Sequence, residues 1–116
     1  MEYSIRRVAA HFEVKISGVP TVPEVRAMLR EMAWQCASAK GALLEVKVAV
    51  GLDFVETQSL FAETDLGLPL DFRYAVLLLD EQARRSADFA QVVAENRGVP
   101  VQVFSQREAA LKWLLS

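Results

Sequence analysis

Few side chains in this sequence could carry out catalysis. His11 is the only histidine and Cys36 the only cysteine. A zinc site or a catalytic triad needs further ligands or partners at suitable spacing, and the residues around His11 supply none. We predict that His11 is solvated or faces a partner, and that Cys36 is a small buried hydrophobe on the apolar stripe of a helix. The sequence therefore predicts a protein that is not an enzyme, with no catalytic residues, metal or cofactor.

The candidate site is geometric instead. In an open α/β sheet, ligands bind beyond the carboxyl ends of the parallel strands. Helix N-termini at that edge direct backbone N–H groups at an anion, and basic side chains add charge. Turns at helix starts are also polar for capping reasons alone, which is the alternative interpretation. The residues that we expect at this edge, as a candidate ligand- or anion-binding site, are Gly51, Leu52, Asp53, Arg84, Arg85 and Ser105.

Alternating hydrophobic residues predict the strands that would position this edge. Residues 3–8 and 11–17 are two extended segments, expected to form an antiparallel pair. In the second segment Phe12, Val14 and Ile16 alternate with polar residues, and residues 42–48 repeat this pattern. The alternation predicts one polar sheet face at these strands, whereas a doubly wound sheet has both faces covered. Residues 101–104 form the last predicted strand.

Capping patterns predict where the helices begin. A Ser, Thr or Asp followed three residues later by Glu is typical of a capping box, and it occurs at Thr21–Glu24, Asp53–Glu56 and Ser105–Glu108. A further helix follows Asp80 and ends before Gly98. Trp34 lies off the apolar stripe of the first helix, either folded over the helix edge or exposed as a partner contact. The predicted order is ββαβαβαβα, one α/β domain over residues 1–116.

The central strand, residues 72–79, is apolar on both alternating sets of positions, as expected of a strand buried on both faces. We place Tyr74, Val76 and Leu78 on the outer face, where the neighbouring strands have Glu and Lys, and we expect Phe104 beside them. These four residues form a candidate interface for self-association or for a protein partner. The alternative is that the terminal helix folds across them.

Composition excludes several other classes of protein. The chain has 116 residues, a formal net charge of −2 and 53% hydrophobic residues. A nucleic-acid-binding protein normally has a basic stripe, which this sequence lacks. The sequence has no run of about 18 apolar residues that could span a bilayer. Its first residues do not suit a signal peptide. With one cysteine and hence no internal disulfide, we expect a cytoplasmic protein.

The last third of the chain resembles a known family. The segments VQVFSQREAALKWL (residues 101–114) and FRYAV (residues 72–76) are similar to the corresponding segments of SpoIIAA-like proteins in the STAS superfamily. That superfamily includes anti-anti-sigma regulators, transporter-attached domains and uncharacterised bacterial proteins. The resemblance implies a mostly parallel sheet of four to five strands, wound as a β-α superhelix with an antiparallel first strand.

The same resemblance implies a non-enzymatic regulatory or protein-interaction module. Phosphorylatable anti-anti-sigma factors have a serine where the third strand meets the second helix, but residues 48–53 contain no Ser or Thr. We therefore do not expect a phosphorylation switch at that turn. The architecture also resembles the CRAL-TRIO lipid-transfer domain, which makes a carrier of a small apolar or lipid-like ligand the alternative function. A carrier requires a closed cavity, whereas we expect the interaction module to form a homodimer.

Overall fold

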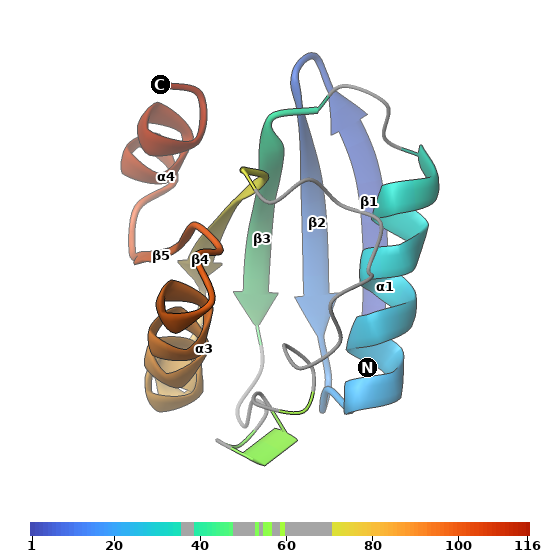
Figure 1. The fold of residues 1–116 in the computed structure, drawn as a ribbon, viewed down its shortest axis with the longest axis vertical. Helices are drawn as coiled ribbons and strands as arrows, with labels where there is room; N and C mark the ends of the chain where they lie inside the picture. Colours follow the sequence, from blue (N-terminus) through green and yellow to red (C-terminus); the bar gives the residue numbers. More distant parts are fainter. Residues whose placement is uncertain (36–38, 48–52, 54, 57–58, 60–70) are drawn as a thin grey trace.

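A five-stranded mixed sheet with the strand order β1-β2-β3-β4-β5 forms the centre of the protein. The computed structural model describes residues 1–35, 39–47, 53, 55–56, 59 and 71–116 (Figure 1). Strand β1 is antiparallel to β2, and the other neighbouring strands are parallel, as predicted. The strands are β1 (Glu2–Val8), β2 (His11–Ser17), β3 (Gly41–Lys47), β4 (Arg73–Leu78) and β5 (Val101–Phe104).

The described helices follow the strands in the predicted order. They are α1 (Val22–Gln35), a 3₁₀ turn η1 (Glu81–Ala83), α3 (Arg84–Asn96) and α4 (Arg107–Leu114). The predicted helix between β3 and β4 lies mostly outside the described residues. Its capping box is described and confirmed, because the Asp53 N–H donates to Glu56 Oε1 (3.2 Å) and the Glu56 N–H donates to Asp53 Oδ1 (2.8 Å).

The other two predicted capping boxes have different outcomes. Thr21 Oγ1 accepts the Glu24 N–H at 3.4 Å and donates to Glu24 Oε1 at 2.8 Å, so the first turn of α1 is capped where predicted. The prediction for Ser105 is wrong, because α4 follows Gln106, which makes no side-chain capping bond. The Ser105 hydroxyl accepts a hydrogen bond from Arg84 instead.

The main hydrophobic core lies between α1, α3 and the inner face of the sheet (Figure 1). Its largest fully buried side chains are Phe12, Val14, Met28, Met32 and Phe72. Alternation on β2 places its hydrophobic residues in this core. Burial of apolar surface of this kind is the dominant stabilising contribution to such a fold.

The predicted outer-face position of Tyr74, Val76 and Leu78 is wrong. The parallel register pairs Val76 with Leu44 and Leu78 with Val46, and all four belong to the inner core. Ala75 and Leu77 are the apolar β4 residues that face outward. Because β4 is apolar at both alternating sets, its periodicity did not indicate which set faces which side.

Helix α4 covers the outer face of β3, β4 and β5. A second, smaller core forms there from Leu43, Ala75, Leu77, Ala110 and Leu114. Phe104 lies on this face as predicted, packed against the Trp113 ring with centroids 5.8 Å apart. The terminal helix therefore covers the apolar outer face, as the alternative expected, but of the four predicted interface residues only Phe104 lies beneath it.

Candidate functional site

The predicted anion-binding residues are only partly brought together. Arg84 Nη2 donates to Ser105 Oγ at 2.9 Å, but the same guanidinium binds Glu81 through two hydrogen bonds of 3.0 and 3.1 Å. This contact lowers the pKa of Glu81 and raises that of Arg84. Arg85 lies over the Phe89 ring, 5.5 Å from its centroid. Among the described residues, the charged group that contacts Ser105 is thus already paired with a carboxylate.

The remaining members of that predicted set are acidic or lie outside the described residues. Asp53 is engaged in its capping box, while Gly51 and Leu52 fall outside the part of the chain that the structure describes. Asp80 Oδ1 accepts the Gln82 N–H at 2.9 Å, which caps the 3₁₀ turn. Capping therefore explains the polar turns described here, and anion binding at this edge stays a prediction.

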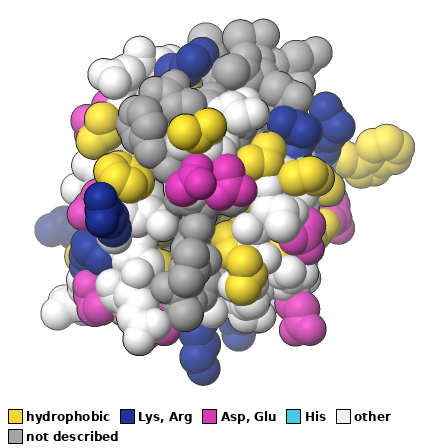
Figure 2. Space-filling model, turned by 90° about the horizontal axis from the view of Figure 1, so that it is seen from below, with side chains coloured by type: hydrophobic (Ala, Val, Ile, Leu, Met, Phe, Trp, Pro, Cys, Tyr) yellow, Lys and Arg dark blue, Asp and Glu magenta, His cyan; other side chains and the backbone are white. Residues whose placement is uncertain are grey.

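Exposed hydrophobic side chains lie at the same edge of the sheet, which we call the carboxyl-end face. Val19 follows the end of β2 and Leu79 directly follows β4, and they are 67% and 55% exposed. Val55, in the segment after β3, is 74% exposed. Figure 2 shows this face from below, with acidic side chains near its centre and hydrophobic side chains around them. Exposed large hydrophobic residues that gather on one face are typical of a partner-binding surface.

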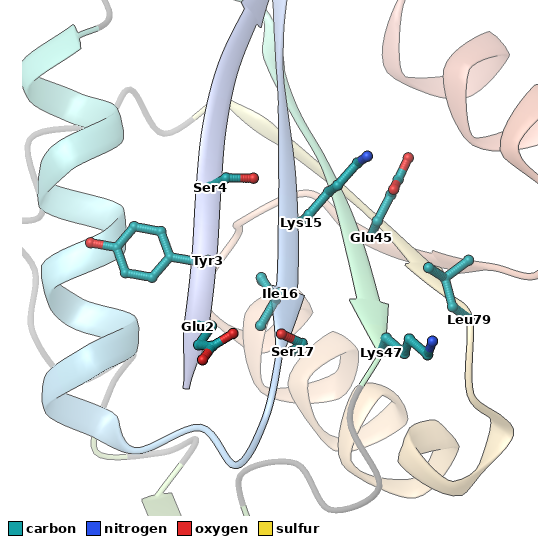
Figure 3. Close-up of a pocket in the computed structure, with 9 residues that line it drawn as sticks. All are labelled: Glu2, Tyr3, Ser4, Lys15, Ile16, Ser17, Glu45, Lys47 and Leu79. Atoms are coloured by element: carbon teal, nitrogen blue, oxygen red, sulfur yellow. The ribbon is translucent and has the colours of Figure 1, made fainter.

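A shallow hollow of about 330 Å³ adjoins the carboxyl-end face on the outer side of the sheet. The side chains of Lys15 and Glu45 project side by side over it, and Leu79 lies at its margin (Figure 3). It is lined by Glu2, Tyr3, Ser4, Lys15, Ile16, Ser17, Glu45, Lys47 and Leu79. This hollow is open to solvent and has charged walls, so it does not provide the closed apolar cavity that a lipid-like ligand requires.

A charged cluster on the outer face joins α4 to the sheet. The Glu13 carboxylate is buried, and its Oε2 accepts a hydrogen bond from Arg107 Nη2 at 2.5 Å. The other arm of the same guanidinium donates to Glu45 Oε1 at 2.5 Å. Arg6 Nη2 contacts Glu13 Oε1 at 3.2 Å. Arg107, followed by His11 and Arg6, lowers the pKa of Glu13 to about 2.

His11 differs from its predicted environment. It is 5% exposed, and its Nε2 lies 3.2 Å from Glu13 Oε2. Its Nδ1 is buried without a hydrogen-bond partner among the described residues. The alternation correctly placed His11 on the outer face of β2, but it did not predict the burial, which depends on how distant parts of the chain pack.

Sequence reasoning did not identify Arg107 as a key residue. It is 94 residues from Glu13 and 62 from Glu45, so no local pattern links it to either carboxylate. The available signal was the pair of acidic residues predicted on the outer face of two neighbouring strands. Glu13 and Glu45 lie on the same face of neighbouring strands, and Arg107 at the start of the terminal helix contacts both.

The described residues contain no group of three His, Cys, Asp or Glu side chains that could hold a metal ion. Within the same residues, no helix has the length and apolar character needed to cross a membrane. Cys36 lies outside the described residues. Trp34 is 91% exposed, so its ring does not fold over the helix edge.

Comparison with known proteins identifies the fold. No protein-family model matches the chain, and no curated protein is similar to it in sequence. The crystal structure of an anti-sigma factor antagonist from Mycobacterium paratuberculosis is similar to it, with a TM-score of 0.68 and 14% sequence identity. The match covers 99% of this chain and 94% of that chain. The fold is STAS-like. The resemblance in the last third of the sequence is thus confirmed for the fold.

Proposed function

We propose that this protein is a non-enzymatic regulatory module that binds a protein partner through its carboxyl-end face. The similarity in fold to an anti-sigma factor antagonist over nearly the whole chain supports a regulatory role. A shared fold by itself does not assign function. The proposal therefore depends on the surface of this chain.

The observation that carries the proposal is the exposure of Val19, Val55 and Leu79. Leu79 is the informative member, because it directly continues β4, whose last residue Leu78 is only 5% exposed. Leaving a leucine side chain in water forgoes roughly 1 to 2 kcal/mol of transfer free energy, which a partner's apolar side chain could recover.

Charged residues at this face favour binding over catalysis. Asp53 and Asp80 cap helical turns, and Arg84 is held by Glu81. General acid–base catalysis needs a group that is positioned toward a substrate and has a suitable pKa. These side chains instead stabilise the local backbone, so we assign them to shaping the face.

Binding at this face would not be controlled by phosphorylation at the turn after β3. Residues 48–53 supply no Ser or Thr hydroxyl. We propose that the complex forms without a phosphorylation switch at this turn.

Leu79→Glu tests the proposal, because it places a charge at the expected contact, on a side chain that is 55% exposed. Partner proteins would be captured from the organism that encodes the chain, and the dissociation constant would be measured with the purified partner by calorimetry. We expect Leu79→Glu to weaken binding by roughly 100-fold or more, as is typical of a hot-spot residue.

Trp34→Glu is the matched control, because Trp34 is also exposed but lies near the other end of α1, away from the carboxyl-end face (Figure 1). The proposal predicts unchanged affinity for this variant. If Trp34→Glu abolishes binding and Leu79→Glu does not, the partner surface is at the other end of the molecule and the proposal is wrong.

A further inference from the structure

Strand β1 forms one edge of the sheet. Among the described strands it pairs with β2 alone, through a continuous register from Glu2 to Val8. The opposite edge strand, β5, has four residues and is flanked by α3 and α4. Natural edge strands are commonly protected by proline, by a bulge, by short length or by charged side chains. The seven residues of β1 include no proline and no bulge, and their charges, at Glu2, Arg6 and Arg7, are of both signs.

The side chains of β1 alternate in a way that suits pairing with a copy of itself. Glu2, Ser4 and Arg6 are exposed on the outer face. Tyr3 and Ile5 are half-buried and pack against the inner core. The strand thus carries an acidic residue near one end, a basic residue near the other, and a small hydroxyl midway between them.

A two-fold axis normal to the sheet restricts the possible registers. Two copies of β1 would run antiparallel, and directly opposed residues must lie on the same face. The axis can therefore pass only through a residue position, and not between two positions. An axis at Ser4 places Glu2 opposite Arg6 of the second copy, twice by symmetry. An axis at Ile5 would instead place Ser4 opposite Arg6, and one at Tyr3 would place Glu2 opposite Ser4.

We propose that this protein forms a homodimer by antiparallel pairing of β1 with β1 of a second copy, centred on Ser4. Charge complementarity selects this register, because it alone sets Glu2 against Arg6. The pairing would also bring Tyr3 of each copy opposite Ile5 of the other, over the inner face. The dimer uses neither the carboxyl-end face nor the predicted interface at Tyr74, Val76 and Leu78, which lies in the core. It is independent of the function proposed above.

Charge-swapped variants test the register. In the Glu2→Arg variant, the new arginine of each copy would oppose Arg6 of the other copy. In the Arg6→Glu variant, Glu2 of each copy would oppose the new glutamate of the other. Analytical ultracentrifugation should show that each variant alone self-associates at least about tenfold more weakly than the natural chain. An equimolar mixture of the two should regain the dimer, because both opposed pairs are then complementary. Circular dichroism and the thermal midpoint check that each variant is folded, which matters because Arg6 also contacts Glu13.

Disulfide trapping tests the same axis at a single position. In a Cys36→Ser background, Ser4→Cys would place two thiols directly opposite each other, within reach of a disulfide. Ser17→Cys, on the outer face of β2 beside Glu2, is the control. We expect rapid covalent dimer formation by Ser4→Cys alone. The proposal is overturned if the natural chain stays monomeric at millimolar concentration, if the mixed variants do not associate, or if Ser17→Cys crosslinks as fast as Ser4→Cys.

Discussion

Glu13 shows how a single buried carboxylate can join separate parts of the chain. Its partners are Arg6 on β1, His11 on its own strand and Arg107 at the start of α4. The Arg107 contact is the largest cause that lowers the pKa of Glu13 to about 2 in the folded protein, from an ordinary value of 4.5. Because the folded-state pKa is the lower one, the charged form stabilises the fold. That stabilisation is fully present above pH 4.5 and is lost as pH falls toward 2.

Glu13→Gln should therefore destabilise the protein in a pH-dependent way. We expect a loss on the order of 2 kcal/mol in the free energy of unfolding at pH 7. This is less than the full pKa shift would give, because Arg107 is half-exposed and solvent screens its charge. The difference from the natural chain should shrink between pH 4.5 and pH 2. Urea denaturation at several pH values measures it. Glu81→Gln is the control, since its exposed contact with Arg84 should contribute little at any pH. A pH-independent difference for Glu13→Gln would show that packing, and not charge, explains the loss.

At the scale of elements, Gly41 sets how closely α4 and β4 approach β3. A Cβ at this position would lie 2.5 Å from Leu114 Cδ1 and would clash with the Arg73 carbonyl oxygen. Leu114 can adopt another rotamer, but the Arg73 carbonyl belongs to the backbone of the neighbouring strand. The requirement for glycine here is therefore steric and comes from packing between elements.

Gly41→Ala should cost roughly 3 kcal/mol or more in the free energy of unfolding, because a backbone shift must relieve the clash. Gly98→Ala is a matched comparison. Its φ of +73° disfavours alanine, but nothing lies within 4 Å of the added methyl group. We expect a cost of about 1 kcal/mol there. Equal costs in chemical denaturation would contradict a steric role for Gly41.

Element order was predictable, whereas some of the packing between elements was not. Alternation on β2 fixed its buried face, and the caps at Thr21 and Asp53 marked real helix starts. Strand β4 is apolar on both sets of positions, so its orientation depended on the register with β3. Likewise Ser105 matched a capping pattern, but its hydroxyl binds Arg84, which is 21 residues earlier in the chain. Local patterns predict local geometry, and contacts between distant segments can override them.

At the scale of the whole molecule, the sheet separates two apolar layers of unequal size. The inner layer joins α1, α3 and all five strands, while the outer one joins only α4 to β3, β4 and β5. An eight-residue helix is not stable by itself in water, so α4 depends on this packing. Arg73 adds to it, because its Nη1 donates to the Trp113 carbonyl at 2.7 Å and to the Ser116 carbonyl at 3.1 Å. Because the outer layer is the smaller one, we expect α4 to detach more easily than the strands of the sheet separate from one another.

Leu114→Ala tests this hierarchy, because it removes a fully buried side chain from the outer layer alone. Such a deletion costs roughly 3 kcal/mol. Hydrogen exchange should show that the amides of α4 exchange at least tenfold faster than in the natural chain. The exchange rates of the β2 amides should change much less, because the opening is local. Met32→Ala, in the inner layer, should instead accelerate exchange in both elements, because every strand rests on that core. If Leu114→Ala accelerates β2 as strongly as α4, the two layers unfold as one cooperative unit and α4 is not a separate lid on the sheet.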